Sequence, residues 1–165
     1  MNELKQTPYK IYVDLDGTLV DFVEQTKKLT GHTPDELQSQ GGDPKMWGEI
    51  KKHGIDFWKN MPWISDSKKM WNMLKKYNPK ILSSPAKIIE ECKPGKMAWV
   101  KNNLGGHVVV LFSRASEKCN YADENSILID DLQKNIDQWR AKGGIGILFK
   151  NPAQAIKELE KLGIK

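Results

Sequence analysis

Two carboxylates lie two residues apart after a short apolar run near the start of the chain. Asp14 and Asp16 belong to the segment "KIYVDLDGTLVDF" and are followed by Gly17 and Thr18. Carboxylates this close perturb each other's pKa, so a metal ion, a buried proton or exposure to solvent must compensate for the repulsion. With a metal, one acid could attack a phosphorus while the other transfers a proton. The pair is therefore a candidate catalytic centre.

Polar side chains also follow three later apolar runs. Because ligands bind at the carboxyl ends of the strands in an open parallel sheet, residues at these positions are expected to meet. Taken singly, each is explained more simply as a turn or a helix cap, but their repetition at successive runs favours one site. These residues are Ser83, Ser84, Arg114, Ser116, Lys118, Asp130 and Asp131.

The chemistry of this set follows from its charge. Several carboxylates in one crevice need a hard cation, and ligation by oxygen alone favours Mg²⁺. Hydroxyl groups and a lysine nearby would hold the oxygens of a transferring phosphoryl group. Gly17 allows a sharp turn, and Thr18 can form a hydrogen bond to a neighbouring acid. The set predicts phosphoryl transfer through an aspartyl-phosphate intermediate.

The elements that must position these residues alternate along the chain. Four apolar runs resemble the one before Asp14, and they span 79–84, 107–113, 126–131 and 144–149. Nearly continuous apolar runs are typical of parallel strands that are buried on both faces. Amphipathic patterns occupy 65–77, 94–106, 132–144 and 153–163, the first with Ser65 or Asp66 as its N-cap. The alternation predicts an α/β fold with a five-stranded parallel sheet and helices on both faces.

One interval breaks the alternation. Residues 21–66 contain no convincing strand, the helix breakers "GGDP" and several aromatic residues. We expect a small, mostly helical cap inserted after the first strand. The predicted core domain is then 1–20 and 67–165.

Bulk properties narrow the class of protein. A chain of 165 residues favours one domain with an insertion. The net charge of +5 suits an anionic substrate, nucleic acid or simple solubility, and solubility is the simplest explanation. Cys92 and Cys119 lack metal-type spacing and are expected to be free thiols in a reducing compartment. With no apolar leader and no apolar stretch of membrane-spanning length, we expect a cytoplasmic protein without a membrane partner.

Four short motifs, in the expected order, resemble those of the haloacid dehalogenase (HAD) superfamily: "VDLDGTL", "ILSS", "SEK" and "ILIDD". Longer segments, among them "SSPAKIIEECKPGKMAWVKNNLG" and "ILIDDLQKNIDQWRAKGGIGILF", are similar to the 5'(3')-deoxyribonucleotidase family. The resemblance covers roughly residues 9 to 150. It implies a HAD-like fold with a cap and a Mg²⁺-dependent phosphatase.

The resemblance also implies roles for the first and last motifs. Asp14 would be the nucleophile and a Mg²⁺ ligand. Asp16 would be the general acid and base, with its backbone carbonyl on the metal. Asp130 would complete the metal site and Asp131 would support it from behind, as would Thr18.

The middle motifs would bind phosphate. Ser83 occupies the position that holds the phosphoryl group in the family, with Ser84 beside it. Lys118 matches the lysine that steadies phosphate and nucleophile, although its loop is longer than the family's. Lys96 is the rival for that role, with a solvated helix charge as its simpler explanation. Lys87 matches a lysine on the substrate side.

The resemblance points to a nucleoside monophosphate as the small-molecule substrate. Aromatic residues of the cap could stack on a base, and each is also explained by core packing. These residues are Phe22, Trp47, Phe57 and Trp58, of which Phe22 has the better case because it follows the catalytic strand.

Other functions are also compatible with these residues. One is a HAD phosphatase that acts on nucleic-acid ends or sugar phosphates. Another is a phosphoacceptor signalling domain, but such domains lack a helical insertion after the first strand. A catalytically inactive binding module is disfavoured by the complete set of acids. We do not expect nucleic acid as a partner, and a homodimer is left open.

Overall fold

The computed structural model describes residues 3–165, which divide into two compact units. The first unit comprises the chain up to Leu19, Trp63–Ser84 and Val108–Lys165. The second unit comprises Val20–Pro62 and Pro85–His107.

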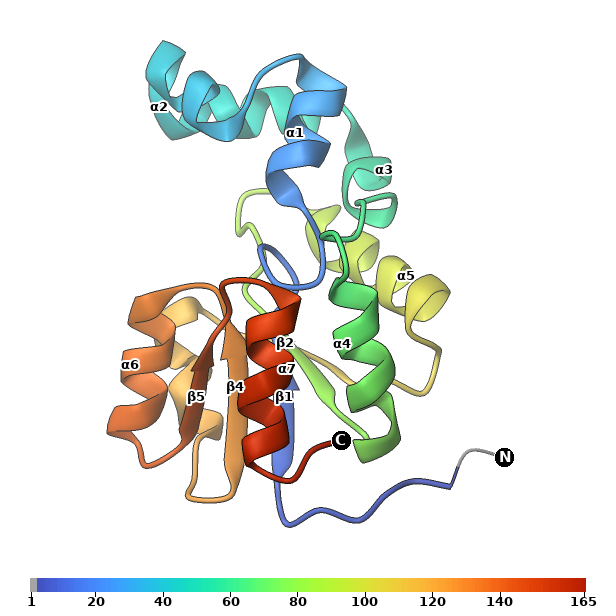
Figure 1. Cartoon of the computed structure of the whole chain (residues 1–165). Helices are drawn as coiled ribbons and strands as arrows, with labels where there is room; N and C mark the ends of the chain where they lie inside the picture. The colour runs from blue at the N-terminus through green and yellow to red at the C-terminus, as the bar shows by residue number, and fades with distance from the viewer. Residues whose placement is uncertain (1–2) are drawn as a thin grey trace. The chain divides into compact units, whose positions relative to one another are not determined.

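A five-stranded, entirely parallel sheet forms the centre of the first unit, as the apolar runs predict (Figure 1). The spatial order is β3-β2-β1-β4-β5, so β1 lies between β2 and β4. In register, Val13 is opposite Ile81 on one side and Ile129 on the other. The residues that follow these three strands therefore come together at one edge. The strands are β1 (Lys10–Val13), β2 (Lys80–Ser83), β3 (Val110–Phe112), β4 (Ser126–Asp130) and β5 (Ile145–Leu148).

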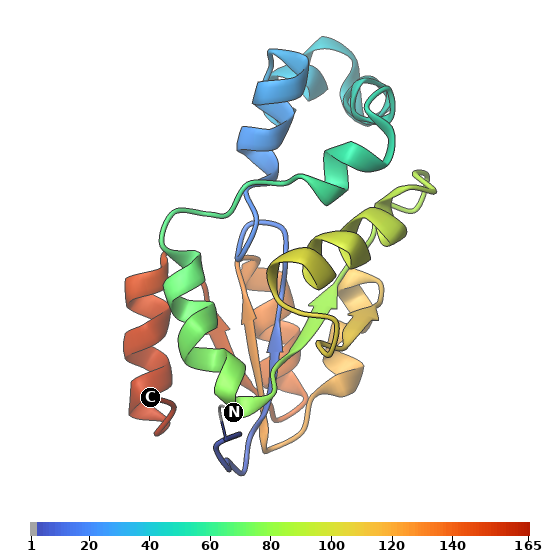
Figure 2. The same ribbon diagram turned by 90° about the vertical axis from the view of Figure 1, so that its right-hand side faces the viewer.

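Helices cover both faces of this sheet, and Figure 2 shows the sheet between its two helical layers. The α4 and α7 helices pack together on one face, while α6 and the short η2 helix pack together on the other. The predicted fold class is confirmed. The helical elements of this unit are α4 (Ser67–Leu74), η1 (Lys75–Tyr77), η2 (Ala115–Tyr121), α6 (Gln133–Ala141) and α7 (Pro152–Lys161).

The start of α4 differs from the sequence prediction. Asp66 occupies the N-cap position, but its backbone is left-handed, with φ of 66°, and its side chain caps no backbone N–H group. Neither Asp66 nor Ser65 is the side-chain cap we expected, because an N-cap side chain reaches the helix from an extended backbone.

The second unit contains four helices, α1 (Phe22–Thr30), α2 (Pro34–Lys51), α3 (Gly54–Lys59) and α5 (Cys92–Asn103). Non-helical backbone at Gly41 and Gly42 breaks α2 where the "GGDP" segment predicts an interruption. The cap that we predicted spans 21–66 only. In the structure, the first segment of this unit ends earlier, at Pro62, and a second segment, 85–107, joins it.

The packing of α3 on α5 explains why the second unit takes in a later segment. Gly95 lies against Trp58 so closely that a Cβ atom at Gly95 would come within 2.4 Å of the Trp58 Cβ. The Trp99 indole donates a hydrogen bond of 2.8 Å to the Met61 carbonyl. Two segments that are distant in sequence thus share one core.

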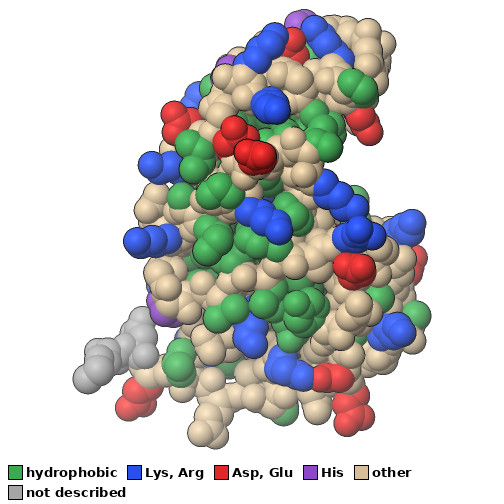
Figure 3. Space-filling model, turned by 180° about the vertical axis from the view of Figure 1, so that it is seen from behind, with side chains coloured by type: hydrophobic (Ala, Val, Ile, Leu, Met, Phe, Trp, Pro, Cys, Tyr) green, Lys and Arg blue, Asp and Glu red, His purple; other side chains and the backbone are tan. Residues whose placement is uncertain are grey.

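The surface and the cysteines fit the bulk properties. Lys and Arg side chains are scattered among hydrophobic and acidic ones on the face seen in Figure 3. Cys92 and Cys119 are both reduced and form no disulfide, as predicted. Among the described helices, none has the length and apolar character to cross a membrane.

Candidate active site

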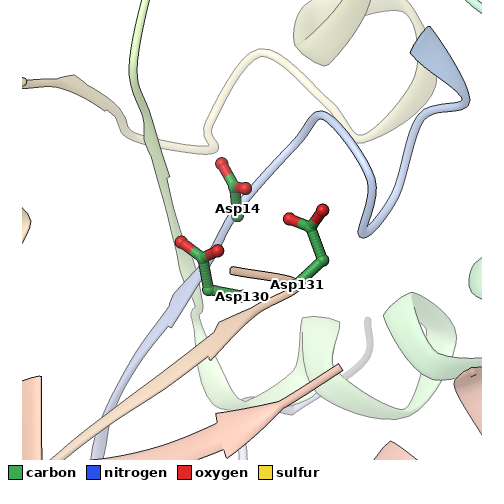
Figure 4. Close-up of side chains that lie close together, drawn as sticks. All are labelled: Asp14, Asp130 and Asp131. Carbon is green, nitrogen blue, oxygen red and sulfur yellow. The ribbon is translucent and has the colours of Figure 1, made fainter. Parts of the chain in front are cut away.

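Asp14 follows directly on β1 and is buried, with 6% of its surface exposed. Its backbone N–H donates to the Ile129 carbonyl at 3.0 Å, which continues the pairing of β1 with β4. Asp130 ends β4 and Asp131 follows it, so the strand register brings three carboxyl groups to one edge of the sheet. Figure 4 shows these three side chains close together.

A tight turn after Asp14 shapes the floor of this site. The backbone N–H groups of Thr18 and Leu19 both donate to the Leu15 carbonyl, and Gly17 has φ of +80°. That conformation favours glycine. A Cβ atom at Gly17 would also lie 2.2 Å from Asp131 Oδ2. The hydrogen bonds and the positive φ confirm the sharp turn that we expected at Gly17, and a side chain there would displace the Asp131 carboxylate.

Lys118 joins the two strand ends. Its amine lies 3.0 Å from Asp14 Oδ1 and 2.8 Å from Asp130 Oδ2, and its side chain is 2% exposed. The loop that looked too long in the sequence folds into η2, and this helix carries Lys118 into the site. An amine between two carboxylates is compensated by charge on both sides.

The Asp130 carboxylate accepts hydrogen bonds at both oxygens. Oδ1 accepts from the Leu132 backbone N–H at 2.9 Å, and Oδ2 accepts from Lys118 and from the Asn135 amide at 3.0 Å. Sequence reasoning missed Asn135. Asn135 lies five residues after Asp130, in the first turn of α6, and a polar residue beside the apolar Ile136 at the start of a helical pattern is the signal that could have pointed to it.

Three carboxylates have the geometry to share a cation. Oxygens of Asp14, Asp130 and Asp131 lie within 4.8 Å of one another. Oδ1 of Asp131 is buried and has no hydrogen-bond partner among the described residues. A buried carboxylate oxygen without a donor costs free energy that a cation would recover, so the site fits Mg²⁺ in donor chemistry and in charge.

The burial and charge of the site change the pKa of its members. Burial raises the pKa of Asp14 to about 8. The positive charge of Lys118 lowers this pKa, and the negative charges of the neighbouring aspartates, Asp130, Asp131 and Asp16, raise it. Burial, reinforced by the charge of Asp130, raises the pKa of Asp131 to about 6. Burial alone would lower the pKa of Lys118, but Asp14 and Asp130 outweigh it and hold that pKa above its usual value.

Comparison with known proteins places the fold. No family model matches the chain, and no curated protein matches it. Several solved structures match it. One is a hydrolase from Streptococcus pneumoniae TIGR4, with a TM-score of 0.57 at 16% identity; the alignment covers 93% of this chain and 100% of the hydrolase chain. A HAD family hydrolase from Deinococcus radiodurans R1, with bound phosphate and sodium, has a TM-score of 0.58 at 12% identity, over 96% of this chain and 98% of its own. This chain has a HAD-like fold.

A third structure of the same fold is a predicted phosphatase from Clostridium acetobutylicum, with a TM-score of 0.55 at 14% identity. It covers 94% of this chain and 90% of its own. At these identities the likeness concerns the fold. In the HAD-like fold of this chain, β1 is the central strand, and Asp14 therefore has a strand end on either side from which other site residues come.

The other candidate residues of the first unit lie at the end of β2 or in the turn that follows β1. Ser83 is the last residue of β2 and is fully buried, while Ser84 and Asp16 are partly exposed. Thr18 is buried, and its Oγ1 has no hydrogen-bond partner among the described residues. The hydrogen bond that we expected from the Thr18 hydroxyl to an acid does not form. The backbone carbonyl of Thr18 instead accepts a hydrogen bond of 2.7 Å from the Ser67 hydroxyl.

The aromatic residues of the second unit form one cluster. The Phe22 ring centroid lies 5.7 Å from that of Phe57, 6.0 Å from Trp47 and 6.1 Å from Trp58. Phe57 and Trp58 are buried, so we assign them to the core of this unit rather than to a base platform. Phe22 and Trp47 keep accessible surface.

Three further basic residues can each be described within their own unit. Lys96 is 1% exposed, and its amine lies 5.6 Å from the Trp58 ring centroid, so the solvated helix charge that we expected is wrong. The aromatic ring and the alkyl packing around α5 replace part of its hydration. Lys87 is exposed in the turn region after β2, outside any helix, and Arg114 is exposed at the start of η2.

Proposed function

We propose that this protein is a Mg²⁺-dependent phosphatase that hydrolyses nucleoside monophosphates through an aspartyl-phosphate intermediate. The observation that carries the proposal is the contact of the buried Asp14 carboxylate with the Lys118 amine at 3.0 Å, beside the carboxylates of Asp130 and Asp131. One end of the sheet thus carries a nucleophile, a positive charge for phosphoryl oxygens and a set of metal-binding carboxylates.

Asp14, Asp131 and the backbone carbonyl of Asp16 would hold the Mg²⁺ ion. The family resemblance implies Asp130 as the third ligand, but the hydrogen bonds that Asp130 accepts from Lys118, Asn135 and the Leu132 backbone favour Asp131 in that role. When bound, the ion neutralises the carboxylates and attracts phosphoryl oxygen.

The first half of the reaction transfers the phosphoryl group to the protein. A carboxylate oxygen of Asp14 attacks phosphorus, and the bond from phosphorus to the ester oxygen breaks. Asp16 donates its proton to the leaving oxygen. Lys118 and Ser83 hold the transferring phosphoryl oxygens and stabilise their charge.

The second half restores the protein. Asp16, now a carboxylate, takes a proton from water, and the resulting hydroxide attacks phosphorus of the aspartyl phosphate. The bond from phosphorus to Asp14 breaks, inorganic phosphate leaves, and both aspartates return to their starting states. The two acids thus divide attack and proton transfer between them.

The substrate class rests on the family resemblance and on the second unit. Phe22 and Trp47 present partly accessible rings, and an aromatic face accepts any nucleobase by stacking. Lys87 is exposed in the chain that follows the phosphate-binding serines and offers a positive charge to an anionic ligand. These features favour a nucleotide over a sugar phosphate.

Phosphate release from a panel of monophosphates tests the proposal. The panel contains ribo- and deoxyribonucleoside 5'- and 3'-monophosphates, sugar phosphates, a 5'-phosphorylated oligonucleotide and an aryl phosphate. We expect deoxyribonucleoside monophosphates to give the highest kcat/KM in Mg²⁺ and no turnover in excess chelator. Preference for sugar phosphates or oligonucleotide ends would contradict the nucleotide assignment, and turnover in chelator would contradict the metal.

A further inference from the structure

Asn135 is a buried amide in the first unit that has no part in the proposed chemical steps. It lies in α6, is 4% exposed, and donates from Nδ2 to Asp130 Oδ2 at 3.0 Å. The helix that carries it is anchored on the sheet, because Ile136 and Trp139 are fully buried in the core cluster with Tyr12. The Trp139 indole also donates to the Ser126 carbonyl at 3.3 Å. The amide of Asn135 is therefore held on a rigid element.

The oxygen that Asn135 contacts is the one that Lys118 uses. Asp130 Oδ2 accepts from Asn135 at 3.0 Å and from the Lys118 amine at 2.8 Å, and that amine reaches Asp14 Oδ1 at 3.0 Å. The contacts run without a break from α6 to the nucleophile. Because the Leu132 backbone N–H fixes Oδ1, the Asn135 amide is the second fixed donor that sets the plane of the Asp130 carboxylate.

From this chain of contacts we infer that Asn135 is a positioning residue for phosphoryl transfer. It holds the Asp130 carboxylate and, through it, the Lys118 amine against Asp14. The inference rests on the proposed function. An ammonium group has three donors; two are directed to Asp14 and Asp130, and the third remains for a phosphoryl oxygen. A small rotation of Asp130 would misdirect that third donor, and misplacement of this kind lowers kcat.

Kinetics of Asn135 variants test the role. In Asn135→Ala we expect kcat to fall roughly 10- to 100-fold while KM changes less than about threefold. Asn135→Asp keeps the shape but replaces the donor with an acceptor, so its kcat should be at least as low. Asn135→Ser keeps a hydroxyl donor and should recover part of the loss. Gln138→Ala, a partly buried amide on the same helix, is the matched control and should leave kcat unchanged.

A double-mutant cycle separates positioning from structural support. If Asn135 acts through Lys118, Asn135→Ala should cost less than about twofold in kcat once Lys118→Met has been introduced. Full additivity of the two losses would overturn the inference. So would an Asn135→Ala protein with wild-type kcat, because the contact would then have no effect on the reaction.

A readout without turnover distinguishes this inference from the proposed function. In crystal structures of the wild type and of Asn135→Ala, or of Asn135→Asp if the alanine variant does not fold, we expect the Lys118 amine to leave Asp14 when the donor at residue 135 is lost. An amine that stays within hydrogen-bond distance of both carboxylates would overturn the inference. Wild-type protein that hydrolyses no monophosphate would contradict the proposed function, whatever the position of Lys118.

Discussion

Asp130 and Asp131 are adjacent in the sequence but have different surroundings, and we expect different roles for them. Asp130 accepts from three donors, whereas Oδ1 of Asp131 is buried without a donor among the described residues. The sequence "DD" shows that two acids follow β4 but does not show which one faces Lys118. That depends on the side-chain direction at the strand end and on the close approach of Asp131 to Gly17.

Asparagine variants of the two acids should separate these jobs. For Asp131→Asn we expect the Mg²⁺ concentration for half-maximal activity to rise roughly tenfold or more, because a charged ligand is lost. For Asp130→Asn we expect kcat to fall, because Lys118 loses an ionic partner. The Mg²⁺ concentration for half-maximal activity should then change by less than about threefold. Titration of activity with Mg²⁺ measures both, and the reverse pattern would assign the metal to Asp130.

The order of strands and helices could be predicted from apolar patterns. Because the strands are parallel, the meeting of their polar end residues in one site could be predicted as well. Asp14 follows β1, while Ser83 and Asp130 are the last residues of β2 and β4, the two strands that flank β1 in the sheet. Lys118 can be identified from its motif, but its position depends on η2, a short helix without an apolar periodicity that would predict it. The association of α5 with α3 depends on the fit of Gly95 on Trp58, which only packing shows.

At the first turn of α1, Phe22 keeps the accessible surface that Phe57 lacks. We expect Phe22→Ala to lower kcat/KM for a deoxyribonucleoside monophosphate at least tenfold and for an aryl phosphate less than threefold, because stacking on a base contributes about 1–3 kcal/mol. Val23→Ala, which changes the exposed neighbour on the same helix, is the control. Equal losses on both substrates would assign Phe22 to the core of the unit.

At the scale of the whole molecule, the acidic site couples stability to pH and to metal. The folded protein holds the Asp14 and Asp131 protons more tightly than the unfolded chain, whose aspartate pKa is near 3.8. Protons are therefore lost on unfolding, and the stability of the metal-free protein falls as pH rises from about 4 to about 8.

Mg²⁺ should reverse this trend, because it competes with those protons for the same oxygens. We expect the increase in Tm on adding saturating Mg²⁺ to be larger at pH 8 than at pH 6, as measured by thermal denaturation against a chelator baseline. In Asp14→Asn most of this difference should disappear. A Tm increase of equal size at both pH values in the wild type would contradict metal binding at these carboxylates.

The central claim is that Asp14 is the nucleophile of a phosphatase, and phosphate release by Asp14→Asn tests it most directly. The substitution keeps the size of the side chain and removes its nucleophilic oxygen anion. Asp137→Asn, an exposed aspartate of α6, is the matched control. In saturating Mg²⁺ and deoxyribonucleoside monophosphate we expect Asp14→Asn to fold with a cooperative thermal transition and to lose at least a thousandfold in kcat. Activity within tenfold of the wild type would contradict the covalent mechanism.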